Sequence, residues 1–224
     1  MGHGTSPLTR FVLRLLVGVP LCVLAWWFLA RDGLLALVAG GGGWFAERLM
    51  AEHVVLADHI DGILRIRTSL SPLHDPLNLA VIEVDPARFT LAFPVFWALI
   101  LATPDARQRL LRLVFGTFLL VLPLAILMAL LFVQFNLALI INNQPMLTER
   151  PPGFYVLALP YPGWAYHLMG VGRQLGLLIM PVVVPVIAWG VLNHRFVQHM
   201  IGSGQAVEDP VPAATEPVDE GDAP

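Results

Sequence analysis

Few side chains in this sequence could do chemistry, and the single cysteine is the first of them. Cys22 lies inside an apolar stretch, whereas a thiolate nucleophile needs a basic or cationic partner beside it. The nearest candidates, His167 and Arg173, are expected at the margin of a later apolar stretch, while Cys22 is expected well inside its own. An unreactive apolar cysteine is therefore the simpler interpretation. One cysteine also excludes an intrachain disulfide and a cysteine-based zinc site.

A second group of residues has the types that bind metals. A metal site needs three or four converging ligands, and the spacings here match no recognised site, so a solvated surface is the simpler interpretation. The group consists of His53, Asp58, His59, Asp61, His74 and Asp75. No metalloprotease, serine-hydrolase, nucleotide-binding or dinucleotide-binding motif is found. We therefore expect no catalytic residue, no metal and no cofactor, and a protein that is not an enzyme.

Arg173 and Gln174 stand at the start of the last apolar stretch. Ionisable groups near a membrane interior are often functional, although an arginine at the margin can simply extend its charge to the interface. We keep both residues as candidate contacts to a partner. The neighbouring Gly172-x-x-x-Gly176 spacing could form a helix-packing face.

The elements that position these residues are long apolar runs. Leu113–Ile141 holds no charged residue or histidine over 29 residues, and Leu15–Ala30 and Leu175–Asn193 behave alike. None shows the polar stripe of a soluble amphipathic helix. Only 13% of the chain is charged, against roughly 25% in soluble domains. The sequence therefore predicts an integral membrane protein.

A fourth apolar run, Phe89–Ala102, is short. As a helix it would cover about 21 Å, less than the hydrocarbon core of about 30 Å. The Leu113–Ile141 run would cover about 43 Å, so it should tilt, or its Gln134–Asn143 end should protrude. Pro123 could kink it. The fold class is a mainly α membrane protein with about four transmembrane helices.

The segment between the first two spans should lie outside the bilayer. Gly33–Gly43 is too short to span and is expected to be a flexible or interfacial connector, and Trp44–Leu56 resembles an amphipathic surface helix. Ile63–Leu70 alternates apolar and polar residues, Leu77–Val84 is rich in β-branched residues, and turn residues separate them. We predict a β-hairpin there. Its polar residues and those following it are candidate partner contacts: Arg65, Arg67, Asp85 and Arg88.

These elements give one linear organisation. It comprises a lead at 1–9, spans at 10–30, 89–102, 113–141 and 169–193, an outer segment at 31–88, an outer loop rich in proline and aromatic residues at 142–168, a basic turn at 103–112, and an acidic, disordered tail at 194–224.

The distribution of arginine predicts the orientation. Four spans place both termini and the 103–112 turn on one side, and the arginine excess in these short segments predicts that this side is cytoplasmic. Arg10 and Arg14 precede the first span without a cleavage site after it, which predicts an uncleaved anchor. The net charge of −3 gives no indication of nucleic-acid binding.

Three segments together resemble the exosortase H-associated membrane proteins of bacteria. The segments that carry the resemblance contain Pro7–Phe11, Arg14, Val19–Cys22, Trp26 and Trp27, then Val84–Pro86, Leu91–Leu99, Leu101 and Ala102, and finally Arg173–Gly176, Met180, Pro181, Pro185, Trp189 and Asn193–Phe196. The chain departs from the family pattern at Asp85 and at Ala87–Ala92. The resemblance implies an inner-membrane accessory protein whose partners, besides the lipid bilayer, are a membrane exosortase or its substrates. It supplies no catalytic residue, and oligomeric state is left open.

Two functions follow as hypotheses. The first is a non-enzymatic accessory protein that binds a membrane partner in an envelope-protein sorting system. The second is a small transporter or channel subunit, which the scarcity of charged residues within the spans disfavours.

Overall fold

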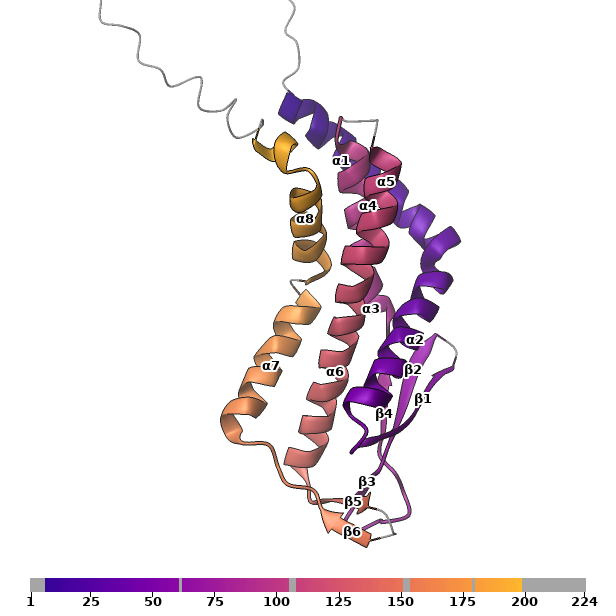
Figure 1. Cartoon of the computed structure of the whole chain (residues 1–224), viewed down its shortest axis with the longest axis vertical. Helices are drawn as coiled ribbons and strands as arrows, with labels where there is room; N and C mark the ends of the chain where they lie inside the picture. The colour runs from indigo at the N-terminus through magenta and orange to yellow at the C-terminus, as the bar shows by residue number, and fades with distance from the viewer. Residues whose placement is uncertain (1–6, 61, 105–107, 151–153, 179, 199–224) are drawn as a thin grey trace, which may run out of the picture.

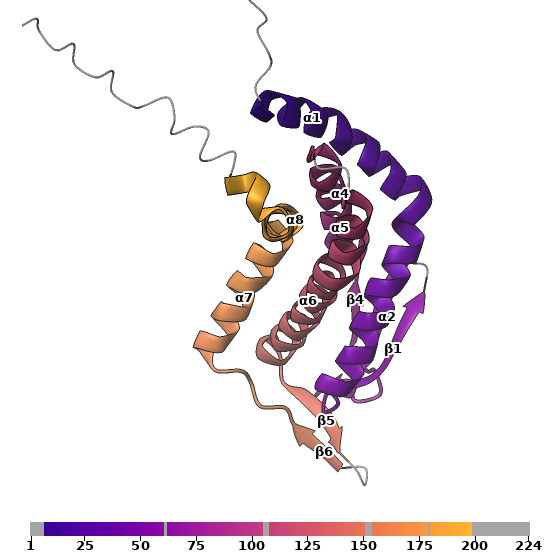
Figure 2. The same ribbon diagram turned by 45° about the horizontal axis from the view of Figure 1, so that its top comes forward.

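The computed structural model describes residues 7–60, 62–104, 108–150, 154–178 and 180–198, which form a helical bundle with two small sheets at one end (Figure 1). The start of α1 (Pro7–Ala25), the end of α8 (Met180–Leu192) and the facing ends of α4 and α5 lie together. We call this the terminal end. The strands lie at the opposite end, the sheet end, in both views (Figures 1 and 2).

The first 43 described residues form one bent helix. α1 continues through a π-helical turn, η1 (Trp26–Ala30), into α2 (Arg31–Leu49). The stretch Leu8–Leu49 is one of two in the described residues that are long and apolar enough to cross a membrane. Two predictions are therefore wrong: Gly33–Gly43 is helical rather than a connector, and the helix predicted at Trp44–Leu56 instead ends at Leu49, with a strand beginning at Val54.

Close packing explains why a glycine-rich segment is helical. A glycine inside a helix costs up to about 1 kcal/mol relative to alanine. A Cβ at Gly43 would lie 3.0 Å from Ala57 Cβ, and one at Gly41 would lie 2.6 Å from Ile126 Cδ1. The glycines let α2 approach both β1 and α6, and those tertiary contacts override the weak helix propensity.

The other long apolar helix follows its prediction. α5 (Arg109–Gly116), a second π-helical turn η2 (Thr117–Val121) and α6 (Leu122–Asn143) run without interruption. The π-helical turn ends two residues before Pro123, whose missing N–H removes a hydrogen bond from this continuous helix and accounts for the local irregularity. At the sheet end, Gln134 Nε2 donates to Tyr161 Oη over 3.0 Å.

The short run Phe89–Ala102 lies at the centre of the bundle. It forms α3 (Ala87–Thr90) and α4 (Ala92–Ala102). Phe93 and Phe96 are fully buried, and α4 packs mainly against α1 and α8. A helix enclosed by other helices does not have to match the thickness of the lipid by itself, so α4 can be short.

The described residues of the last apolar run form two helices. α7 (Gly163–Leu178) begins inside the predicted proline-rich loop, and α8 starts at Met180. Ile179, between them, lies outside the described residues. The shorter apolar helices Ala87–Ala102 and Pro181–Leu192 accompany the two long ones, and the four-span topology stays a prediction.

The predicted hairpin is part of a larger β structure. β2 (Ile63–Thr68) and β4 (Val81–Val84) pair antiparallel as expected, and β1 (Val54–Ile60) adds a third strand on the other side of β2. Gly62, with φ of 79°, supplies the left-handed residue of the β1–β2 turn. We call β1–β2–β4 the first sheet.

A second sheet joins the two predicted outer segments. β3 (Leu70–Pro72) pairs with β5 (Met146–Arg150), which pairs with β6 (Phe154–Leu157). The prediction that residues 142–168 form only a loop is therefore wrong. The proline-rich segment and the hairpin segment stabilise each other through backbone hydrogen bonds, as a lone hairpin could not.

Gly116 provides a test of the central packing. A Cβ there would overlap Phe96 Cζ and lie 2.9 Å from Leu192 Cδ1. Since the Phe96 ring is fully buried and cannot move aside, we expect Gly116→Ala to lower the free energy of unfolding by about 1–3 kcal/mol, measured by denaturant titration in detergent micelles. Gly190→Ala is the matched control, because nothing lies within 4 Å of its added Cβ; equal destabilisation by both would contradict this packing.

Candidate functional site

The outward face of the first sheet carries a small ladder of paired charges. Arg65 Nε lies 3.0 Å from Glu83 Oε1, its direct cross-strand neighbour on β4. Arg67 Nη2 lies 3.7 Å from Asp58 Oδ2, a diagonal neighbour on β1. Burial alternates along β2 as predicted, with Leu64 and Ile66 facing the core. The sequence pattern therefore placed Arg65 and Arg67 correctly on one face.

Apolar side chains surround these charges. Leu77 is 92% exposed, and Ile60, Leu79 and Val81 are exposed too. Together with the four charged residues they line an open groove of about 570 Å³. We call this the sheet groove. Exposed apolar residues clustered around polar groups are typical of interaction surfaces.

The free edge of β1 is less available than this face. Glu47 on α2 accepts a hydrogen bond from Ala57 N over 2.9 Å, on the side of β1 that faces away from β2. This contact satisfies a donor that an added strand would need. A partner is therefore better accommodated on the sheet groove than as a fourth strand at β1.

Asp85 and Arg88 lie beyond the groove, where β4 leads into α3. Asp85 Oδ1 accepts from Ala87 N over 3.0 Å, and Asp85 Oδ2 lies 3.8 Å from Arg88 Nε. The carboxylate thus satisfies a backbone donor at the start of α3. These contacts position the turn that leads into the central helix, and both side chains keep enough exposure to touch a partner.

Arg173 and Gln174 lie on α7, which both views place on the other side of α6 from the first sheet (Figures 1 and 2). The Arg173 guanidinium lies 5.0 Å from the ring centroids of both Phe132 and Phe135, so cation–π contacts hold it against α6. Gln174 is exposed. The six candidate contact residues therefore fall into three places rather than one surface.

A polar network at the terminal end was not predicted. Asn193, only 3% exposed, accepts from Arg112 Nη1 over 2.7 Å and donates to Trp189 O over 2.9 Å. Trp189 Nε1 donates to Thr103 Oγ1 over 2.9 Å. The network ties α8 to α5 and to the end of α4. The only signal in the sequence was the spacing of four between Trp189 and Asn193, which reads equally well as ordinary helix packing.

Aromatic rings complete this end. Phe11 stacks on Trp189 with ring centroids 5.4 Å apart, and Phe196 lies 5.7 Å from Phe11 and 6.3 Å from Trp189. Residues from opposite ends of the chain therefore meet there, and the first and third segments of the family resemblance are in direct contact.

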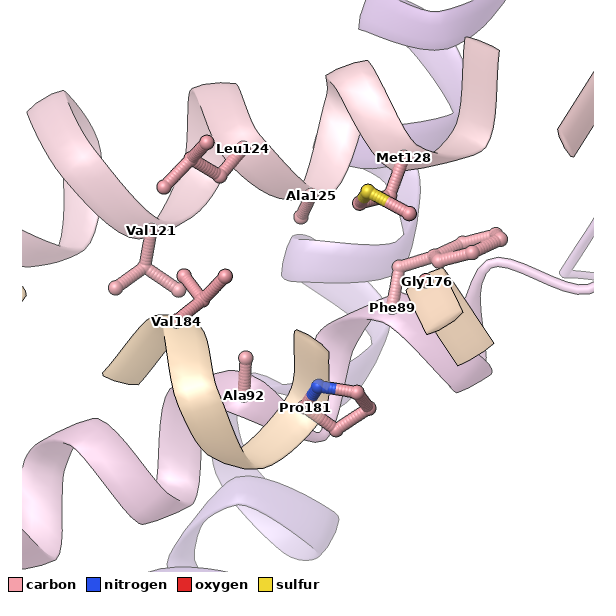
Figure 3. Close-up of a pocket in the computed structure, with 9 residues that line it drawn as sticks. All are labelled: Phe89, Ala92, Val121, Leu124, Ala125, Met128, Gly176, Pro181 and Val184. Atoms are coloured by element: carbon pink, nitrogen blue, oxygen red, sulfur yellow. The ribbon is translucent and has the colours of Figure 1, made fainter. Parts of the chain in front are cut away.

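A narrow crevice separates α6 from the α7–α8 break. Its volume is about 20 Å³, and Figure 3 shows that apolar side chains and Gly176 line it. A Cβ at Gly176 would overlap Met128 Cε, so this glycine allows α7 to approach α6 closely. The predicted Gly172-x-x-x-Gly176 face is used at one position only, because nothing lies within 4 Å of a Cβ at Gly172.

Cys22 and the metal-type residues do not assemble a reactive centre in the described part of the chain. Cys22 is buried on α1, whereas His167 and Arg173 lie on α7, well away from α1 in both views. Among the described residues no group of three or more histidine, cysteine or acidic side chains could hold a metal ion. Asp61 lies outside the described residues.

These features define a mostly helical membrane protein with small sheets at one end of its bundle. The chain belongs to the exosortase H-associated membrane protein family, whose model matches residues 5–196. The match covers all three segments of the resemblance. Comparison with curated proteins and with solved structures found no significant match.

Trp189→Phe tests the network at the terminal end. The substitution keeps a ring against Phe11 but removes the donor to Thr103, so we expect a loss of about 0.5–1.5 kcal/mol in unfolding free energy. Unfolding in detergent, followed by circular dichroism, measures it. Trp164→Phe serves as control, since Trp164 is 72% exposed and should change stability by less than about 0.5 kcal/mol. No difference between the two variants would contradict the role of the Trp189 hydrogen bond.

Proposed function

We propose that this protein is a non-enzymatic accessory of an exosortase-type sorting system and that its sheet groove binds a membrane partner. The family description supports the association with exosortase. The observation that carries the proposal is the groove itself, in which paired charges lie among exposed apolar side chains. The partner is the exosortase or one of its substrates.

The pairing of the charges favours recognition over catalysis. General acid–base or nucleophilic catalysis needs groups poised to exchange protons or attack a substrate. In the sheet groove each arginine faces a carboxylate, so the groups are neutralised in pairs. Such a surface presents a defined charge pattern that can select a partner by complementarity and reject others by repulsion.

The proposed orientation places the sheet groove outside the cytoplasm. Arg10, Arg14, Arg109, Arg112 and Arg195 belong to elements at the terminal end. Positive residues in short segments favour the cytoplasmic side of an inner membrane. With the terminal end in the cytoplasm, both sheets face the compartment in which envelope proteins are processed.

The transporter alternative finds less support. The crevice between α6 and the α7–α8 break is about 20 Å³ and is lined by Gly176 and eight apolar side chains. A space of this size holds at most about one water molecule, and a purely apolar one stays dry. A solute path would need a different arrangement of the helices.

A charge swap tests the groove without removing its ion pair. Arg65→Glu combined with Glu83→Arg keeps a pair at the same place but inverts the pattern shown to a partner. Because the pair is about half exposed, we expect stability to change by less than about 1 kcal/mol. We expect co-purification of the full chain with the exosortase from the same genome to fall at least tenfold.

Arg14→Glu, on the exposed face of α1, is the matched control and should leave co-purification unchanged. Association that survives the swap would place the contact elsewhere on the protein. No association of the unaltered chain with an exosortase would overturn the proposed function. Deleting residues 58–86 is a poorer test, because it removes core side chains such as Leu64, Ile66 and Ile82.

A further inference from the structure

An open pocket of about 820 Å³ lies at the terminal end between α5 and the chain that follows α8. Its polar lining comes from Gln108, Arg112, Asn193, His194 and Arg195. None of the lining residues that the structure describes is acidic. The elements that line it lie at the opposite end of the molecule from the first sheet (Figure 1), so the pocket is separate from the sheet groove.

The cationic side of this pocket is partly fixed and partly available. Arg112 is held in place, because Nη1 donates to Asn193 Oδ1 over 2.7 Å and Nη2 donates to Gln108 Oε1 over 3.0 Å. His194 and Arg195 are exposed, and among the described residues no hydrogen bond or ion pair is found for either. A fixed guanidinium beside a movable one suits an anionic group with several oxygens.

The other side of the pocket is apolar. It is lined by Leu111, Phe115, Leu192 and Phe196. Phe115 is 50% exposed, and the outward faces of the two neighbouring helices continue away from the terminal end with Phe118 and Leu119 on η2 and Ile187 on α8, all exposed. The pocket therefore lies at the boundary between the basic residues of the terminal end and the exposed apolar faces of η2 and α8.

We propose that this pocket binds the headgroup of an anionic phospholipid. The phosphate lies between Arg112 and Arg195, and an acyl chain runs along Phe115 toward the apolar faces of η2 and α8. Basic pockets between membrane helices at a cytoplasmic surface bind such headgroups. A free phosphate would use the arginines but leave the apolar wall exposed to water, which is why a lipid is the better occupant.

Binding can be measured by native mass spectrometry of the delipidated full chain in a neutral detergent. The probes are phosphatidylglycerol and phosphatidylcholine with identical acyl chains. We expect the unaltered chain to prefer phosphatidylglycerol at least tenfold. Arg195→Gln should weaken phosphatidylglycerol binding about fivefold, the effect of one arginine near a lipid surface, and leave phosphatidylcholine binding unchanged. Adding Arg112→Gln should weaken it further.

Arg14→Gln is the matched control, because it removes one charge from an exposed site at the same end outside the pocket. Arg195→Gln leaves the Arg112–Asn193 bond in place, so its result does not depend on the double variant folding. Equal binding of the two lipids, or equal weakening by Arg14→Gln and Arg195→Gln, overturns the proposal. Displacement of the lipid by millimolar inorganic phosphate also overturns the proposal. So does lipid binding that appears only in a variant truncated after Gln198, because the acidic tail would then be the occupant of the pocket.

Discussion

The fold depends on the enclosure of one short helix. α4 has 11 residues, too few to cross a bilayer unaided, yet it links the first sheet to the terminal end. Within lipid there is no hydrophobic gain when one apolar helix meets another, so close packing and hydrogen bonds between helices must hold it. Phe93 and Phe96 are fully buried, and the absent side chain of Gly116 makes room for the Phe96 ring.

Hydrogen bonds fix α4 in register with its neighbours. Trp97 Nε1 donates to Thr117 Oγ1 on η2 over 3.0 Å, and at the terminal end Trp189 of α8 reaches Thr103. Both bonds join an indole to a threonine hydroxyl, and both threonines are buried, where an unpaired polar group would be costly. Since one bond lies along α4 and the other at its end, they set the rotation of the helix as well as its height in the bundle.

The sequence predicted those parts of the fold that depend on local pattern. Period-two alternation predicted the buried face of β2 and its pairing with β4, and the absence of charge predicted α5–α6. It failed where a distant contact decided the outcome. Gly41–Gly43 are helical because α6 and β1 pack against them. The strand β1 was not predicted, because apolar and polar residues alternate poorly over Val54–Ile60, around its bulge.

The same distinction applies to the candidate sites. Arg65 and Arg67 were placed on one face by alternation along a single strand, so their neighbourhood could be predicted. The Arg112–Asn193 network joins residues 81 positions apart, and no local pattern reports such a contact. Arg173 and Gln174 were expected at the margin of a span, and they lie within α7, which begins at Gly163 inside the predicted loop.

One face of α7 is apolar and exposed. Trp164, Leu168 and Val171 are more than half exposed, and their spacing of four and three puts them on one helix face. The opposite face holds Tyr166, which stacks with Phe135 at 6.2 Å. A helix that packs through one face against α6 and exposes an apolar stripe on the other suits apolar surroundings, as membership of a membrane-protein family implies.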